Sequence, residues 1–272
     1  MTTLDSSTEA YPTVEGLTIE LADGVLSITM NRPDSLNSLT QAMLAGIADS
    51  VERAGSDDCV RVVRLSGAGR GFSSGAGISE EDQKTSRAGS PTDVIDEANR
   101  AVRAIVALPK PAVAVVHGPA AGVAVSLAIA CDIVLASENA FFMLAFTKIA
   151  LMPDGGASAL IAAAVGRTRA MRMALLAERI QAREAMDWGL VTAVYPAENF
   201  DAEVDKVVAA LINGPAVALR KTKHAINAAT LTELEGALER EKEGQSALIT
   251  SHDFVEGALA FQQHRTPTFT DS

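Results

Sequence analysis

Two glycine-rich segments of the 272-residue chain could present backbone N–H groups to a ligand. Residues 71–78 read GFSSGAGI and follow an apolar run, and residues 117–124 read HGPAAGVA and run into small apolar residues. Small residues let a ligand approach the backbone, and the first N–H groups of a helix have no partner within it. Such donors stabilise negative charge that develops in acyl or enolate chemistry. Together the two segments predict an enolate-stabilising site.

One carboxylate follows these segments. Asp154 stands in the sequence LMPDGG, residues 151–156, directly before a predicted helix at 157–165. It could cap that helix, which is the interpretation that the sequence alone favours, or it could shuttle a proton beside the enolate site. Apolar neighbours such as Met152 and Phe146 should raise its pKa by desolvation.

Two other patterns suggest different chemistry. Residues 71–75 fit the G-x-S-x-G nucleophile elbow, with Ser73 as nucleophile and Asp154 and a histidine downstream. That elbow should follow its strand directly, whereas residues 67–70 intervene, so a serine hydrolase is a disfavoured alternative. A dinucleotide loop is disfavoured because Phe72 stands where the third glycine belongs. The four histidines lack the spacing of metal ligands, so no metal site is expected.

Composition excludes several classes of protein. The 34 acidic and 23 basic residues give a net charge of −11, which argues against binding to nucleic acid. The two cysteines, Cys59 and Cys131, lie far apart and fit reduced thiols in a cytoplasmic protein. No apolar run is long enough to span a membrane, and no secretory signal is expected.

Strand and helix patterns alternate along most of the chain, which predicts an α/β fold. A hairpin is expected at 17–30, and buried strands are expected at 60–65 and 112–116. Further strands are expected at 133–136 and 140–143. The predicted helices are 41–54, 93–107, 122–130 and 157–165, with Thr40 as the N-cap of the first.

Helices dominate after residue 157, and the last of them are expected at 202–213, 215–229, 232–248 and 252–263. We divide the chain into a flexible arm at 1–15, a core at 16–205 and a C-terminal helical region at 206–272. That region is too small to bury its own apolar positions and should pack on the main body or on another subunit. The positions concerned are Leu234, Leu238, Leu248, Ile249, Phe254, Leu259 and Phe261.

The chain resembles the crotonase (enoyl-CoA hydratase/isomerase) superfamily along almost its whole length. The matching stretches, in the family's order, are 31–39, 72–78, 117–132, 151–158, 185–191 and 254–269. The Pro-Asp-Gly-Gly stretch and the chain's ending most resemble the isomerase branch related to phenylacetate-pathway isomerases. The resemblance implies a spiral core of ββα units and a C-terminal helical region that assembles trimers, commonly paired into hexamers.

The resemblance also assigns catalytic roles. The N–H groups of Ala76 and Val123 would form the oxyanion hole, and Asp154 would remove and return the substrate proton. Many relatives carry glycine where Val123 stands, so its side chain should narrow the pocket. Ser126 and Phe146 replace the two glutamates with which hydratases activate water, so a double-bond shift is favoured over hydration.

The partner that the resemblance implies is an acyl-CoA thioester, with no cofactor besides the coenzyme A of the substrate. Arg32, Ser35 and Leu36 would lie near the pantetheine and phosphates, and Ile78 would lie beside the adenine. Phe261 would come from a neighbouring subunit. The remaining candidates for substrate binding are Ser74, Gly122, Ser126, Phe146 and His264.

Two departures from the family's pattern weaken the assignment of the CoA-binding residues. Ser79 and His264 stand where relatives commonly carry lysine, for which Lys221, Lys223 and Arg265 could compensate. The favoured function is an enoyl-CoA isomerase. The alternatives are a hydratase of low activity and a non-catalytic acyl-CoA-binding protein.

We predict that the protein binds CoA thioesters more tightly than the corresponding free acids. The paired donors would bind the oxygen of a thioester, and residues 32–36 would bind the nucleotide-containing CoA moiety, which a free acid lacks. Calorimetry with one acyl-CoA and its free acid tests this expectation, and equal affinities would contradict it.

Overall fold

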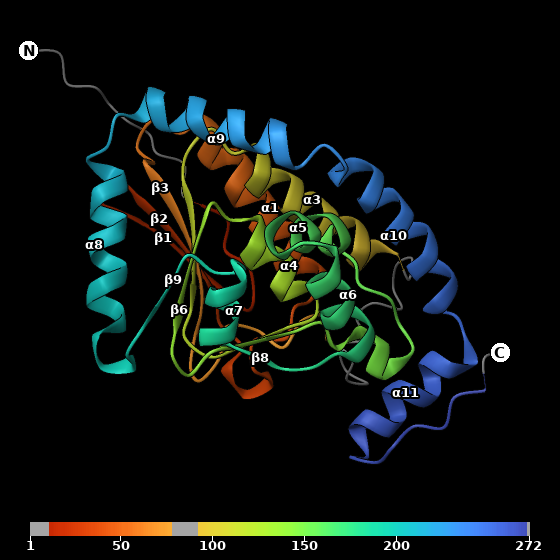
Figure 1. Ribbon diagram of the computed structural model, residues 1–272. Coiled ribbons are helices and arrows are strands. Elements are labelled where there is room, and N and C mark those ends of the chain that lie inside the picture. Colours follow the sequence, from red (N-terminus) through yellow and green to blue (C-terminus); the bar gives the residue numbers. More distant parts are fainter. Residues whose placement is uncertain (1–10, 78–91, 271–272) are drawn as a thin grey trace, which may run out of the picture.

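The computed structural model describes residues 11–77 and 92–270. Its larger sheet has six strands in the order β1-β2-β3-β4-β6-β9 (Figure 1). These strands are β1 (Leu17–Ala22), β2 (Val25–Met30), β3 (Val62–Gly67), β4 (Ala112–Val116), β6 (Ile133–Ser137) and β9 (Ala193–Tyr195). The first two form the predicted antiparallel hairpin. Asp23 and Gly24 both have positive φ angles, which are required by a two-residue turn whose twist matches that of the two strands it joins. From β2 to β9 all pairs are parallel.

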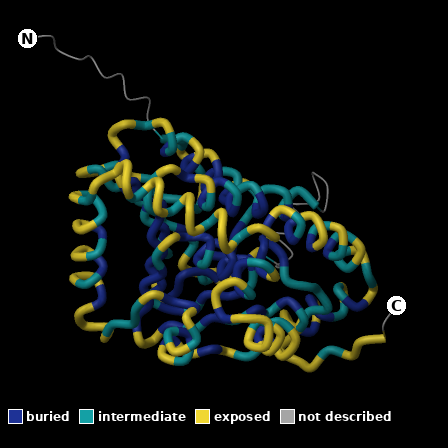
Figure 2. Tube along the Cα trace, turned by 45° about the horizontal axis from the view of Figure 1, so that its top comes forward, coloured by how far each residue is buried: buried dark blue, intermediate teal, exposed yellow. Residues whose placement is uncertain are grey.

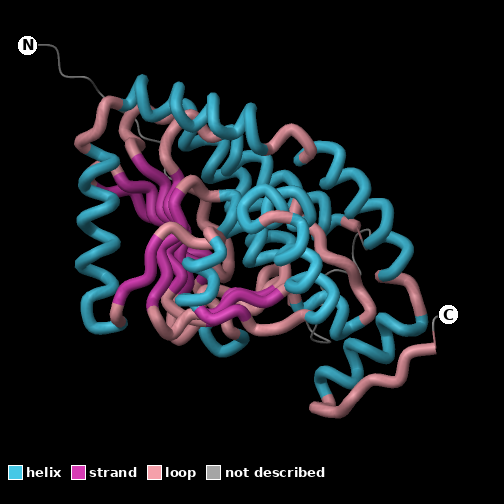
Figure 3. Tube along the Cα trace, in the orientation of Figure 1, coloured by secondary structure: helices cyan, strands magenta, loops and turns pink. Residues whose placement is uncertain are grey.

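A smaller sheet contains β5 (Pro119–Ala121), β7 (Phe141–Met143) and β8 (Ile180–Gln181). It lies beside the large sheet in Figure 3. Successive strands therefore enter the two sheets in turn, as in β4-β5-α4 (Val123–Ala130) and β6-β7-α5 (Ala157–Val165). This arrangement confirms the predicted α/β fold and its spiral of ββα units.

Helices cover both faces of the large sheet. On one face, α8 (Phe200–Ile212) packs Phe200, Val204 and Val208 against buried valines of β3 and β4. On the other face lie α4, α5, α1 (Gln41–Ser56) and α3 (Asp93–Ala107) (Figure 1), and the main core forms among them, in the region where the trace is mostly buried (Figure 2). The Thr40 hydroxyl accepts a hydrogen bond from the Met43 N–H, which confirms the predicted cap of α1.

The later helices are α6 (Arg167–Leu176), α7 (Ala182–Trp188), α9 (Ala216–Thr230), α10 (Leu234–Leu248) and α11 (His252–Gln262). Three short 3-10 helices are η1 (Pro33–Ser35), η2 (Ala145–Ile149) and η3 (Ala197–Asn199). Helices dominate after residue 157 as predicted, but the sequence missed β5, β8 and β9, which are too short for an alternating pattern. The predicted domain boundary at residue 205 falls inside α8. None of the described helices is long and apolar enough to cross a membrane.

Helix α10 packs on the body of its own chain, against α5 and α3. Leu234 is buried and Leu238 is 0% exposed, and both belong to the main core. Of the two expected packing surfaces, these two leucines therefore use the main body of their own chain and not another subunit. Apolar spacing along a helix shows that a face is buried, but it does not identify the surface that buries it.

We expect Leu238→Ala to lower the free energy of unfolding by roughly 2–5 kcal/mol, because it empties a filled position in the core. Leu175→Ala, at an exposed position of α6, is the matched control and should change stability by about 0.5 kcal/mol or less. Urea unfolding of both variants measures the difference. Equal stabilities would show that α10 is not part of the cooperative core.

Candidate active site

The two donor segments meet at one edge of the large sheet. Residues 72–77 follow β3, residues 119–123 follow β4, and these neighbouring strands are parallel. The carboxyl ends of parallel strands lie at the same edge, so the segments that leave them are brought together. A bridge pairs Ser73 with Ala120, in which the Ala121 N–H donates to the Ser73 carbonyl at 2.9 Å.

Both predicted donors have N–H groups that bind no acceptor among the described residues. Ala76 forms a parallel bridge with Leu39, which bonds to Gly75 and Gly77 and so leaves the Ala76 N–H on the opposite side. Val123 is the first residue of α4, where an N–H has no partner within the helix. Two free donors therefore stand at the ends of adjacent segments.

Glycines allow this close approach. Gly75 has a φ of 90°, and a Cβ atom there would lie 2.7 Å from the Ala121 carbonyl oxygen. Gly122 has a φ of 57°, and a Cβ atom there would lie 3.7 Å from the Gly75 Cα atom. A side chain at Gly75 would push the segments apart, and both positions require a conformation that other residues rarely adopt.

Asp154 lies in the buried loop before α5 and is 8% exposed. Its Oδ2 atom accepts a hydrogen bond from Gln245 Nε2 of α10 at 3.0 Å, whereas its buried Oδ1 atom has no partner among the described residues. The helix-cap interpretation is wrong. The N-cap of α5 is Gly156, and the N–H groups of Gly156 and Ser158 donate to Glu241 at 2.6 and 2.7 Å.

Burial raises the pKa of Asp154 from the ordinary value of 3.8 to about 7. The hydrogen bond from Gln245 opposes the rise, and the negative charge of Glu241 adds to it. The expected direction and its cause, desolvation, are therefore confirmed. A carboxyl group with a pKa near 7 can both accept and return a proton at neutral pH.

The Asp154 loop lies directly against the first turns of α4. A Cβ atom on Gly155 would lie 2.9 Å from Val123 Cγ2, and the Ser126 hydroxyl donates to the Asp154 carbonyl oxygen at 2.9 Å. The Val123 side chain is buried and packs toward this loop. The fold thus brings together the three predicted catalytic residues, Ala76, Val123 and Asp154.

Phe146 of η2 is buried beside Gly122, where an added Cβ atom would lie 3.9 Å from its ring. Helix α11 packs on η2 through Gly257, whose added Cβ atom would lie 2.6 Å from Ile149 Cα. Phe261 is 60% exposed near the end of α11, and His264 follows that helix with a φ of 53°. Neither of these last two is brought to the donors by a described contact within the chain.

The segment predicted to bind CoA joins the first donor segment directly. The Ser74 N–H and hydroxyl donate to the carbonyl oxygens of Leu36 and Ser35 at 2.8 and 3.0 Å. Arg32 lies half-buried in the same turn and donates through Nη1 to the Ser38 hydroxyl at 2.9 Å. Ile78 lies outside the described residues.

Asn37 holds this turn to the donor segment, although the sequence marked it only as part of a matching stretch. Its buried amide nitrogen donates to the carbonyl oxygens of Ala68, Gly71 and Phe72 at 2.8, 2.9 and 3.2 Å. The buried Ser73 hydroxyl donates to the Asn37 carbonyl oxygen at 2.7 Å and accepts from the Gly75 N–H. Ser73 is engaged in structural contacts, which gives no support to a serine nucleophile.

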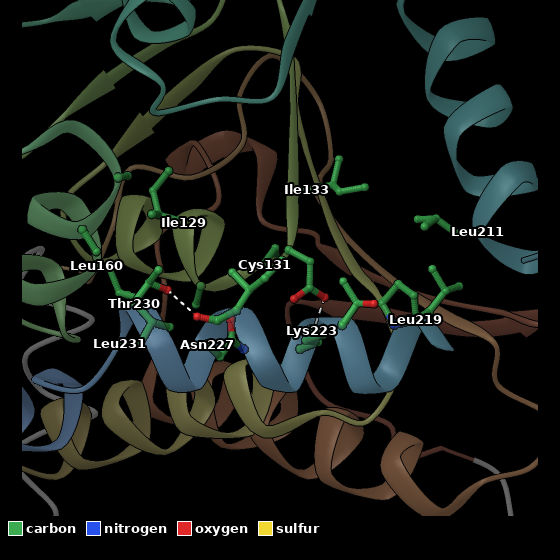
Figure 4. A pocket seen from close by; sticks show the side chains of 17 residues that line it. Ile129, Cys131, Ile133, Leu160, Leu211, Leu219, Lys223, Asn227, Thr230 and Leu231 are labelled. Atoms are coloured by element: carbon green, nitrogen blue, oxygen red, sulfur yellow. Dashed lines mark hydrogen bonds and ion pairs between the residues drawn. The ribbon is translucent and has the colours of Figure 1, made fainter. Parts of the chain in front are cut away.

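A separate cavity of about 450 Å³ lies where α9 crosses α4 and α5 (Figure 4). Lys223 at its edge pairs with Asp132 at 2.9 Å and donates to the carbonyl oxygens of Ile105 and Lys110. Arg265 likewise binds both carboxylate oxygens of Glu256. Both cations are therefore engaged by groups of their own chain, which gives no support to a contact with CoA phosphates.

None of the described predicted site residues lines this cavity, so it is not the site of the two donors and Asp154. Within residues 11–77 and 92–270, no group of three or more histidine, cysteine, aspartate or glutamate side chains could hold a metal ion.

Comparison with known proteins shows the family. The model of the enoyl-CoA hydratase/isomerase family matches residues 20–272. A 1,2-epoxyphenylacetyl-CoA isomerase of Escherichia coli is 36% identical over 91% of this chain and 95% of its own. A 2,3-dehydroadipyl-CoA hydratase of the same organism is 31% identical over 90% and 94%. The crystal structure of an enoyl-CoA hydratase from Mycobacterium avium subsp. paratuberculosis is 68% identical, with a TM-score of 0.90 over 95% of this chain and all of that one.

The raised pKa of Asp154 predicts how stability varies with pH. Between pH 3.8 and about 7 the folded protein holds a proton on Asp154 that the unfolded chain has lost, so stability falls as pH rises through this window. Asp154→Asn imitates the protonated form and removes this loss, which amounts to about 4 kcal/mol at most. Urea unfolding should therefore show the variant gaining stability over wild type at high pH but not at low pH. An equal difference at both ends of the window would contradict the burial argument.

Proposed function

We propose that this chain, which belongs to the enoyl-CoA hydratase/isomerase family, shifts the double bond of an enoyl-CoA thioester. One observation carries the proposal. Asp154 is a buried carboxyl with a pKa near 7 and one oxygen without a partner among the described residues, and its loop packs against Val123. Ser126 and Phe146 stand where the resemblance places the glutamates of hydratases. A double-bond shift needs only one group that takes a proton and returns it.

The chemistry follows from these positions. The thioester oxygen accepts hydrogen bonds from the Ala76 and Val123 N–H groups, which stabilise negative charge as it develops there. Asp154 removes a proton from C2 of a 3-enoyl-CoA, and the electrons spread over a dienolate. The same carboxyl then returns the proton at C4, which leaves the double bond between C2 and C3.

Hydration requires more functional groups in the site than a double-bond shift does. One group must orient the water and another must protonate C2. The Ser126 hydroxyl already donates to the Asp154 backbone, and Phe146 has no polar atom on its side chain. Hydration of low activity and acyl-CoA binding without catalysis remain the alternatives, and assays of 2-enoyl-CoA and 3-enoyl-CoA panels distinguish all three.

The remaining parts of the proposal concern binding and location. Residues 32–36 lie next to Ser74 and would bind the CoA moiety beside the donors. No further cofactor is needed for a proton shift, because the thioester itself supplies the electron-accepting group. We place the activity in the cytoplasm, consistent with two cysteines that form no disulfide.

We propose assembly into trimers or dimers of trimers, because α11 leaves Val255, Leu259 and Phe261 exposed on one chain. A trimer or hexamer should therefore sediment at micromolar concentration. Leu259→Ser with Phe261→Ser should weaken the assembly, and the control Leu175→Ser should not. Sedimentation of wild type as monomer alone would contradict the proposal.

Asp154→Asn should reduce isomerisation by roughly 10²–10⁴-fold, the usual contribution of a positioned acid–base group. Acyl-CoA affinity should stay within a few-fold because the amide is nearly isosteric. The wild-type rate should rise with pH through about 7, as the pKa of Asp154 requires. Conversion of a 3-enoyl-CoA, followed together with binding calorimetry, measures these effects.

Asp187→Asn, at an exposed position, is the control for the effect of removing one carboxylate elsewhere on the chain. Ser126→Ala should lose far less activity than Asp154→Asn, since a serine hydroxyl does not carry the proton at neutral pH. An Asp154→Asn variant with full isomerase activity would place the base elsewhere. A wild type that shifts no double bond would favour the non-catalytic alternative.

A further inference from the structure

Two buried polar side chains of α10 reach the Asp154 loop from one face of the helix. Glu241 is 1% exposed and Gln245 is 2% exposed, and they stand one helical turn apart. Glu241 accepts hydrogen bonds from two N–H groups at the start of α5, while Gln245 contacts Met152 and Asp154. Together they hold both ends of the loop that carries the candidate base.

The orientation of the Gln245 amide follows from its two partners. Its Oε1 atom accepts the Met152 N–H at 3.1 Å, and a backbone N–H can only donate. The amide nitrogen must therefore be the group that faces Asp154, 3.0 Å from Oδ2. A flipped amide would place two donors against each other at Met152.

This orientation has a consequence for the proton on Asp154. Because Nε2 donates to Oδ2, that oxygen serves as an acceptor whether the carboxyl is ionised or neutral. When Asp154 is protonated, the proton is carried by Oδ1. That oxygen is the one that is buried without a hydrogen-bond partner among the described residues.

We propose that Gln245 is a positioning residue that reserves Oδ1 of Asp154 as the oxygen exchanging the proton with the substrate, on a loop that Glu241 holds in place. The assignment of the exchanging oxygen rests on the proposed isomerase function. The orientation of the carboxyl rests only on the contacts of α10.

The charged groups around Asp154 make the proposal testable by pH. Glu241 on α10 contributes a negative charge that raises the pKa of Asp154, while the hydrogen bond from Gln245 lowers it. Arg240 acts on Glu241 from the same helix. The facing side chains of α4 and η2, Ser126 and Phe146, carry no charge. Removing each α10 side chain should therefore move the titration of Asp154 in opposite directions.

The first experiment compares Gln245→Met, Glu241→Gln and the control Glu243→Gln, which is an exposed glutamate on the same helix. Gln245→Met keeps the length of the side chain but loses both the donor to Asp154 and the acceptor of the Met152 N–H, so kcat should fall by about ten- to a hundredfold with KM nearly unchanged. The rise of activity with pH should move to higher pH in Gln245→Met and to lower pH in Glu241→Gln. Glu243→Gln should change neither, and an unmoved profile with normal kcat in Gln245→Met would overturn the proposal.

A second measurement needs no activity. Infrared difference spectra between wild type and Asp154→Asn, at about pH 5, should show the C=O stretch of the protonated carboxyl. If Oδ2 is the carbonyl oxygen bonded to Gln245, this band should move to higher frequency in Gln245→Met. An unmoved band would refute the assignment of the proton to Oδ1. A shifted band in a protein that isomerises no enoyl-CoA would instead refute the proposed function and leave the orientation intact.

Discussion

The hydrogen bonds from the start of α5 to Glu241 are the contact on which the rest of the site depends. A buried carboxylate is stabilised there by two backbone N–H groups and by the positive end of the helix. The contact seats α10 against the body, and Gly156 makes room for Leu234, which would lie 2.7 Å from a Cβ atom at that position. The preceding loop is thereby held between α10 and α4, and Asp154 is held with it.

The two buried carboxyl groups of this region differ in how their charge is compensated. Glu241 accepts two backbone N–H bonds, whereas Asp154 accepts a single side-chain amide and leaves one oxygen without a partner. Burying a polar atom without a partner is unfavourable, so the stability of this loop must come from the surrounding contacts. The same unsatisfied atom is what a base requires, since a fully bonded carboxylate is a poor proton acceptor. The loop thus loses stability at the position of the proposed base.

Local signals in the sequence predicted much of the fold and part of the site. Asp23-Gly24 fixes a turn, Thr40 caps its own helix, and the donor segments follow adjacent strands, so each of these was visible within a short window. Gln245 was not visible, because it meets Asp154 from 91 residues away, and Glu241 reaches α5 across 85 residues. The wrong cap assigned to Asp154 has the same origin. The local sequence assigned the N–H groups at the start of α5 to the nearest acid, Asp154. In the structure these groups bind the distant carboxylate of Glu241.

The relation between donor and base depends on packing as much as on hydrogen bonds. Val123 supplies its N–H to the donor pair and its side chain to the contact with Gly155, while Ser126 on the next turn binds the Asp154 carbonyl. A glycine at 123 would keep the donor but lose this contact, and a larger residue at 155 would displace the loop. The valine and the glycine therefore act as a complementary pair. Their fit sets the position of Asp154, the proposed proton shuttle, relative to the N–H of Val123, the proposed oxyanion donor.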